Sequence, residues 1–285
     1  MIIISEALPA FHRHLLHQEA SANTMAKYLR DVRLLGHITG DRIDCLEQLL
    51  QFKSALQQRG YAVRSINSMI SAVNQFVCFC GHPEWKLRLL KWQRTIFVDE
   101  KHEIRQQEYQ RLVNTAMKQG RERLALILQT LCATGIRVSE IRAITVASLR
   151  SGMAEICSKG KIRTILLPRS LCEKLLDYCA RRGIRTGCIF ITRSGRVMDR
   201  SNIWRQMKRL HAAARVRQEK IFPHNLRHLF ACCFYQKFKD VVRLADILGH
   251  SSVDTTRIYT ARSTAGERRR MELLGLVVGQ RKKTT

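Results

Sequence analysis

Apolar residues recur at helical spacing along most of the chain, and this pattern limits the fold more than any other feature. Within the segment 62–80, six apolar residues from Ile66 to Val77 form a single stripe along one helix face. Either Ser21 or Asn23 can cap a second helix, in which Met25 and Leu35 belong to the apolar face. The first part of the chain therefore predicts a bundle of four helices, at about 5–18, 22–36, 44–59 and 62–80.

The helical pattern stops in the mixed string WQRTIFVDEKHE, from Trp92 to Glu103, which is typical of a linker. We place the first domain at 1–95, the linker at 96–104 and a second domain with a C-terminal tail at 105–285. The fold class expected is mainly α, with a small β-sheet (α+β) in the second domain.

That sheet is predicted as a hairpin of 152–159 and 161–168, because Ile162, Thr164 and Leu166 alternate and Gly160 permits a tight turn. Pro223 suits the first turn of one of the helices that follow. The helices expected in this domain lie at about 106–119, 121–132, 170–182, 200–215, 225–238, 241–248 and 252–260, before a last apolar stretch at 271–278.

The chain is strongly basic, with 50 Lys and Arg against 23 Asp and Glu and a formal net charge of +27. Residues 1–98 hold 12 basic and 7 acidic side chains, and the rest hold 38 and 16. Phosphate groups that bind such a surface release counterions, so a polyanionic partner is expected, and a merely solubilising basic surface is the alternative.

Targeting and cysteine patterns indicate an ordinary cytoplasmic protein. No run approaches the roughly 18 apolar residues of a membrane helix, and the segment MIIISEALPAF lacks the basic leader of a signal peptide. The ten cysteines include no C-x-x-C pair, so we expect buried free thiols rather than disulfides or a zinc site.

Six polar residues in the second domain suggest a site that attacks a phosphodiester without a metal. Two arginines can grip phosphate oxygens through their planar, permanently charged guanidinium groups. Imidazoles can donate hydrogen bonds, a phenol can act as nucleophile, and a lysine can protonate the leaving oxygen. Each residue alone is more often a surface charge or a packing side chain, so the argument depends on the set. Its members are Arg137, Lys159, His224, Arg227, His250 and Tyr259.

The strings around these residues resemble the boxes of tyrosine recombinases of the phage integrase family. ATGIRVSE, around Arg137, is similar to the first arginine box, with Glu140 in support. PHNLRH is similar to the H-x-x-R box, and LGHSSVDTTRIY to the closing box with Tyr259. The resemblance covers residues 105–265 strongly and the N-terminal bundle weakly, and it is nearest to compact Xer-like recombinases or mobile-element integrases.

The resemblance implies a mechanism. Tyr259 would attack the scissile phosphate to form a covalent 3′-phosphotyrosyl link, and a freed 5′-hydroxyl would then rejoin a partner strand, with neither metal nor other cofactor. Arg137, Arg227 and His250 would stabilise the transition state, with His224 assisting proton transfer. Lys159 would be the general acid, although Lys161 remains an alternative two residues away.

The resemblance also implies partners. The first domain would be a SAM-like core-binding domain that clamps double-stranded DNA at a specific recombination site, with Lys27, Arg64 and Ser68 in contact with the duplex. The enzyme would act as a homotetramer or dimer of dimers, in integration, excision or resolution of DNA. The apolar segment MELLGLVV would dock either on a neighbouring subunit or on its own domain.

Two other functions fit the same residues. A type IB topoisomerase-like enzyme would use the tyrosine to relax supercoils without exchanging strands. A non-catalytic DNA-binding protein would need only the basic charge. The complete six-residue set argues against the second of these.

Overall fold

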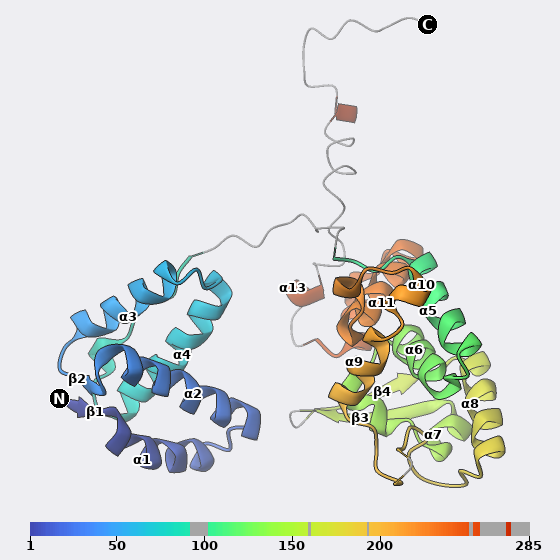
Figure 1. Ribbon diagram of the computed structural model, residues 1–285, viewed down its shortest axis with the longest axis horizontal. Helices are drawn as coiled ribbons and strands as arrows, with labels where there is room; N and C mark the ends of the chain where they lie inside the picture. The colour runs from blue at the N-terminus through green and yellow to red at the C-terminus, as the bar shows by residue number, and fades with distance from the viewer. Residues whose placement is uncertain (92–101, 159–160, 193, 251–252, 257–271, 275–285) are drawn as a thin grey trace, which may run out of the picture. The chain divides into compact units, whose positions relative to one another are not determined.

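The computed structural model describes residues 1–91, 102–158, 161–192, 194–250, 253–256 and 272–274. The chain divides into two compact units, Met1–Arg94 and Thr95–Thr285. We describe each unit by itself (Figure 1). No helix among the described residues is long and apolar enough to cross a membrane.

The N-terminal unit contains the four predicted helices, α1 (Ile4–His17), α2 (Ala22–Thr39), α3 (Leu46–Gln58) and α4 (Val63–Phe79). Ser21 is the cap of α2, since its hydroxyl accepts a hydrogen bond from the backbone N–H of Thr24 at 3.2 Å. The apolar stripe of α4 is completely buried at Ile70, Val73 and Phe76. The prediction of a helical bundle is therefore confirmed.

A pair of short strands in this unit was not predicted. Strands β1 (Ile2–Ile3) and β2 (Arg42–Ile43) pair in antiparallel register, with Ile2 opposite Ile43. Two-residue strands are too short to show any alternation in sequence. The pair ties the start of the chain to the segment after α2, and both Ile2 and Ile43 enter the core.

The C-terminal unit combines many helices with one hairpin, which confirms the predicted fold class (Figure 1). Strands β3 (Met153–Ser158) and β4 (Lys161–Leu166) pair in antiparallel register from Met153–Leu166 to Ser158–Lys161. The α-helices are α5 (Gln106–Lys118), α6 (Glu122–Thr134), α7 (Val146–Ser151), α8 (Arg169–Arg182), α9 (Arg200–Lys208), α10 (His211–Ala214), α11 (Pro223–Phe238), α12 (Val241–Leu248) and α13 (Val253–Thr256). Three 3₁₀ helices complete the described elements, η1 (Pro83–Trp85) in the N-terminal unit and η2 (Val138–Ala143) and η3 (Gln218–Lys220) here.

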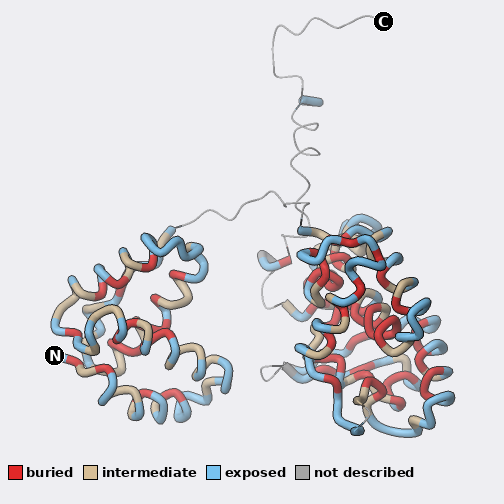
Figure 2. The backbone as a smooth tube through the Cα atoms, in the orientation of Figure 1, coloured by how far each residue is buried: buried red, intermediate tan, exposed pale blue. Residues whose placement is uncertain are grey.

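Helix α6 lies at the centre of this unit and packs against α5 and α11. Its residues Leu124 to Leu128 are all buried, so it shows no solvent-facing stripe over that turn (Figure 2). The single helix predicted over 200–215 is instead two helices, α9 and α10, separated at Arg209 and Leu210. Leu210 is completely buried at this break.

Strand β4 was predicted from the alternation of Ile162, Thr164 and Leu166, but the opposite face of the strand is the buried one. Ile162 and Leu166 are each 72% exposed, whereas Ile165 is 2% exposed. Arg163 lies in phase with Ile165, on the inner face, and its side chain is 15% exposed. A charged residue on the buried face of a strand requires a partner, and Arg163 has one in the site described below.

All ten cysteines lie in described residues and are free. The prediction of free thiols is confirmed, but the expectation that they are buried is too simple. Cys172 and Cys179 are buried, Cys157 is exposed, and the others are intermediate.

Candidate active site

The end of helix α6 positions Arg137. Gly135 ends the helix in the left-handed region, with φ of +65°, and Arg137 then precedes η2. The backbone N–H of Arg137 donates to Glu140 Oε2 at 2.7 Å, and its guanidinium donates to Glu140 Oε1 at 2.9 Å. Glu140 thus holds Arg137 by both backbone and side chain. The Arg137 side chain remains 39% exposed, so a ligand can reach it.

Glu140 also binds a second arginine. Arg163 donates from NH2 to Oε2 at 2.8 Å and from NH1 to Oε1 at 3.2 Å. Burial opposes ionisation of this carboxyl, but hydrogen bonds from the Arg137 backbone and from both guanidinium groups outweigh it, so the pKa of Glu140 is lowered. Glu140 is a carboxylate shared by two arginines. The sequence interpretation missed Arg163, and its only signal was its phase with Ile165.

Arg227 is almost completely buried, with 1% of its surface exposed. It lies on α11 and donates from NH1 to the carbonyl of Gly135 and from NH2 to the carbonyl of Leu248, both at 2.7 Å. These carbonyls belong to the ends of α6 and α12, where the partial negative charge of a helix favours a cation. Arg227 therefore joins the ends of two helices and keeps its full positive charge.

His250 follows the end of α12 and contacts Arg227. Its Nε2 lies 3.0 Å from Arg227 NH2, and its Nδ1 lies 2.8 Å from Thr256 Oγ1. A guanidinium can only donate, so Nε2 must accept, and the ring is neutral with its proton on Nδ1. Desolvation, followed by the charges of Arg227, Arg137 and Arg163, lowers the pKa of His250 to about 4.

His224 lies in the first turn of α11, directly after Pro223, which begins the helix as expected. As a whole, the residue is exposed. Partial desolvation, then the positive charges of Arg227, His228 and Arg137, lower its pKa. These electrostatic interactions show that His224 lies near the two arginines.

The structure thus brings together four of the six predicted residues, Arg137, His224, Arg227 and His250, and adds Arg163 beside the supporting Glu140. Lys159 and Tyr259 lie outside the described residues, as does most of MELLGLVV. The hairpin pairs Ser158 with Lys161, the residues on either side of Lys159 and Gly160.

Two of the residues expected to touch DNA are neighbours in the N-terminal unit. Lys27 Nζ lies 2.5 Å from Asp31 Oδ2 and donates to the backbone carbonyl of Ser68 at 3.0 Å. Lys27 therefore links α2 to α4, while 32% of its side chain stays exposed. Arg64 is exposed on the first turn of α4.

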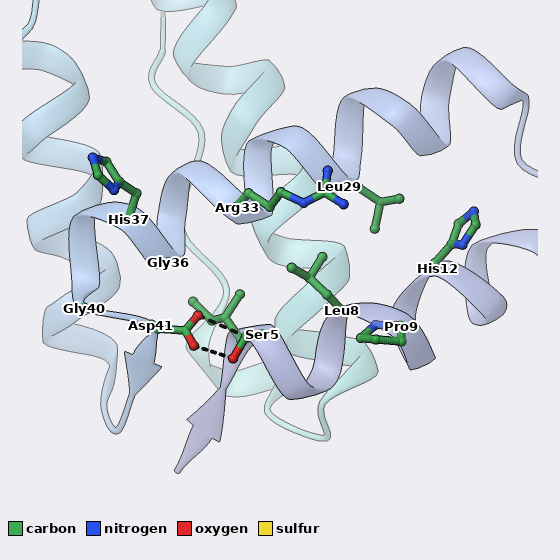
Figure 3. A pocket seen from close by; sticks show the side chains of 11 residues that line it. Ser5, Leu8, Pro9, His12, Leu29, Arg33, Gly36, His37, Gly40 and Asp41 are labelled. Atoms are coloured by element: carbon green, nitrogen blue, oxygen red, sulfur yellow. Dashed lines mark hydrogen bonds between the residues drawn. The ribbon is translucent and has the colours of Figure 1, made fainter.

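The same unit contains an open cavity of about 770 Å³ between α1 and α2 (Figure 3). At one end, Asp41 accepts hydrogen bonds from the backbone N–H of Ser5 at 3.1 Å and from its hydroxyl at 2.5 Å. Arg33 and the apolar side chains of Leu8 and Leu29 also line it. None of the described catalytic candidates Arg137, His224, Arg227 and His250 is among the residues that line this cavity.

A cysteine and a histidine on α11 resemble a nucleophile and base. Cys232 Sγ lies 3.4 Å from His228 Nε2, and the same nitrogen contacts the carboxylate of Glu103. Burial, with the charge of Glu103, raises the pKa of Cys232 to about 12, so it stays a thiol. Across the described part of the chain, no three His, Cys, Asp or Glu side chains are placed to hold a metal ion.

Comparisons with known proteins show the family to which the chain belongs. The model of the phage integrase family matches residues 102–265, and that of the phage integrase N-terminal SAM-like domain matches residues 8–81. Tyrosine recombinase XerA of Pyrococcus furiosus is 28% identical over 266 residues, which cover 90% of this chain and 89% of that protein.

Solved structures share the fold. XerH site-specific recombinase, in a post-cleavage complex with palindromic difH substrate, has a TM-score of 0.70 at 20% identity, covering 91% of this chain and 81% of that one. A lambda integrase dimer bound to a COC′ core site has a TM-score of 0.73 at 15% identity, covering 98% and 99%. At these identities the likeness concerns the fold alone.

The described residues thus share with these structures a helical unit with a β-hairpin, and it follows a SAM-like domain. The chain belongs to the phage integrase family. Its activity is that of a tyrosine-type site-specific DNA recombinase, and the topoisomerase and non-catalytic alternatives are not favoured.

Proposed function

We propose that the cluster of Arg137, Arg227 and His250 binds the scissile phosphate of a recombination site. The observation that supports this most directly is the hydrogen bonding of Arg227, whose guanidinium is held by two helix-end carbonyls. These neutral acceptors fix its position without cancelling its charge. A preorganised cation of this kind stabilises the charge that develops on the non-bridging oxygens.

Tyr259 is the nucleophile in this proposal. Its oxygen attacks the phosphorus, the bond from phosphorus to the 5′-oxygen breaks, and a 3′-phosphotyrosyl link forms. Lys159 donates the proton that the departing 5′-oxygen takes up, and His224 assists the transfer of the phenol proton away from Tyr259. A 5′-hydroxyl of the partner strand then attacks the link and releases Tyr259. The bond energy is conserved, so the strand exchange needs neither ATP nor a metal ion.

His250 changes its role when phosphate binds. In the described site its Nε2 accepts from Arg227, and the surrounding cations keep the ring neutral. A bound phosphodiester adds negative charge beside the ring and offsets these cations, which raises the pKa of His250. The protonated ring can then donate from Nε2 to a non-bridging oxygen, so the site supplies this donor when phosphate is present.

We infer that the partner is double-stranded DNA carrying a specific recombination site. The net charge of +27 supports a polyanionic partner. The XerH structure holds its difH substrate, and the lambda integrase dimer holds a core site. Lys27, Arg64 and Ser68 would contact the duplex from the SAM-like domain. The active form would be a homotetramer or dimer of dimers. The protein would act in the cytoplasm, where the DNA lies.

A covalent-trapping experiment tests this function. The probe is a nicked suicide duplex whose sequence is selected by the full chain from a random-sequence library. We expect the wild type to form a covalent adduct in the presence of EDTA. Tyr259→Phe should bind the same duplex with unchanged affinity and form no adduct, because only the attacking oxygen is lost. Adducts that persist in Tyr259→Phe, or that disappear with EDTA, would refute the proposal.

A second measurement tests strand exchange itself. Two plasmids carrying the selected sequence should recombine with the wild type. Supercoil relaxation of arbitrary plasmids by the monomer, with no recombinant product, would instead identify a topoisomerase.

A further inference from the structure

Arg163 contacts two parts of the candidate site that are distant in sequence. From the inner face of β4, its two terminal nitrogens bind both oxygens of Glu140, the carboxylate that holds Arg137. The distances of 2.8 and 3.2 Å form a forked pair, a geometry that a planar guanidinium can make and an ammonium cannot. The orientation of Glu140, and through it that of Arg137, therefore depends on Arg163.

The same side chain lies directly against the residue before His250. A Cβ atom at Gly249 would stand 2.7 Å from Arg163 Cδ and 2.8 Å from its NH1, closer than real Cβ contacts come. Gly249 also has φ of +63°, in the left-handed region. The backbone next to His250 can pack against the Arg163 side chain only because residue 249 is a glycine.

We propose that Arg163 is a positioning residue for the strand-cleavage reaction, acting on Arg137 through Glu140 and on His250 through Gly249. This inference rests on the proposed function of the site. The forked pair directs the Arg163 guanidinium at Glu140, so we assign its effect on Arg137 to that carboxylate.

The position of Arg163 on the hairpin gives this role a further consequence. Lys159, the proposed general acid, lies four residues earlier on the same hairpin. Arg163 thus connects strand β4 to Glu140 and Arg137, the proposed phosphate-binding arginine. Weakening this contact should slow the cleavage step more than it weakens the binding of DNA.

The test compares Arg163→Lys with Arg181→Lys in the full chain. Arg181 also forms a forked pair with a glutamate, Glu122, but about half of its side chain is exposed, on α8. Both variants keep the charge and lose the fork, so nonspecific attraction to DNA stays equal. The probe is the selected suicide duplex described above, and the measurements are its dissociation constant, the rate of adduct formation and the thermal midpoint.

We expect Arg163→Lys to form the adduct at least about tenfold more slowly, with a dissociation constant within about twofold of wild type, because the contact matters in the transition state. Arg181→Lys should match the wild type in both. Each rate is divided by the fraction of the protein that is folded. This fraction is measured as the amount of duplex that the variant binds, whether or not it cleaves it. A partly folded variant therefore still gives a result.

A double-mutant cycle separates positioning from a general structural effect. Because Arg163 acts in part through Arg137, the double variant Arg137→Lys/Arg163→Lys should be slowed by clearly less than the product of the two single losses, the remainder being the effect through Gly249 on His250. Multiplicative losses in the cycle, a wild-type rate for Arg163→Lys, or equal losses for Arg181→Lys would each overturn the inference. A wild type that forms no adduct would count against the proposed function itself.

Discussion

Gly135→Ala is the substitution whose effect on this protein the structure defines most closely. Gly135 ends helix α6 with φ of +65° and ψ of +14°. An added Cβ would stand 2.5 Å from Cδ1 of Phe230 and 3.1 Å from Cδ2 of Leu248. The carbonyl of the same residue accepts the 2.7 Å hydrogen bond from Arg227. The substitution therefore strains the backbone, overpacks the core and moves an acceptor of the site at once.

A matched glycine separates the two contributions to the expected loss of stability, backbone strain and overpacking. Gly183 ends helix α8 with φ of +67° and ψ of +22°, and a Cβ there would meet nothing within 4 Å. Gly183→Ala should therefore lose only the left-handed backbone term, about 1–2 kcal/mol. Gly135→Ala adds overpacking of about 1–3 kcal/mol. The free energy of unfolding should fall by about 2–5 kcal/mol in Gly135→Ala.

The assay needs a signal from the C-terminal unit alone. Replacing Trp85 and Trp92 by phenylalanine leaves Trp204, on α9, as the only tryptophan of the chain. Urea unfolding followed by Trp204 fluorescence should then show Gly135→Ala below Gly183→Ala by roughly 0.5–1.5 M in midpoint, for a slope of about 2 kcal/mol per M. Adduct formation should fall in Gly135→Ala and stay unchanged in Gly183→Ala.

Equal midpoints for the two variants would refute the close approach of Gly135 to Phe230. A destabilised Gly135→Ala that forms adducts at the wild-type rate would refute the second part of the reasoning, that the carbonyl of Gly135 positions Arg227.

Three further predictions follow from the site and its surroundings. Lys159→Ala should cleave slowly. A substrate with sulfur in place of the 5′-bridging oxygen should restore the rate of this variant, because a thiolate leaves without a proton. If the sulfur substrate rescues Lys161→Ala instead, Lys161 is the general acid. Asn225 is 4% exposed and donates to the carbonyls of His102 and Lys220, both at 2.8 Å. Asn225→Ala should lose about 1–3 kcal/mol in the Trp204 assay, and an unchanged midpoint would contradict this. The pKa of His250 is about 4 in the folded chain against 6.5 for an ordinary histidine, so the unfolded state binds more protons between these values. Stability should therefore decline as the pH falls from about 6.5 towards 4, and His250→Gln should flatten this decline; an equally steep decline in the variant would assign it to other groups.

The sequence predicted the helices well because their apolar residues recur at the helical period. Helix α4 shows this clearly, since the stripe at Ile70, Val73 and Phe76 is the face that is buried. The break between α9 and α10 was not predicted, because neither proline nor glycine marks it and Leu210 suits a continuing helix as well as a turn. The four described catalytic candidates were found through their surrounding strings rather than through any period.

Arg163 shows where sequence reasoning ends. Alternation in β4 pointed to Ile162 and Leu166, yet both side chains are exposed and the inner face holds Arg163 and Ile165. Which face of a hairpin is buried depends on what packs against it, and that is a tertiary property. Glu140, 23 residues away, makes the inner position suitable for an arginine.

A carboxylate at the proposed phosphate site would by itself repel the ligand, but the charge balance there explains the presence of Glu140. Before phosphate binds, Arg137, Arg163 and Arg227 with Glu140 carry a net charge of +2 and His250 is neutral; protonation of His250 on binding would add one further positive charge. Attack by a tyrosinate on a phosphodiester brings together one negative charge from each, a total of −2 in the transition state. Without Glu140 the three guanidinium groups would repel one another and leave Arg137 unheld. Glu140 thus stabilises the cluster before DNA binds and still leaves the charge that the reaction requires.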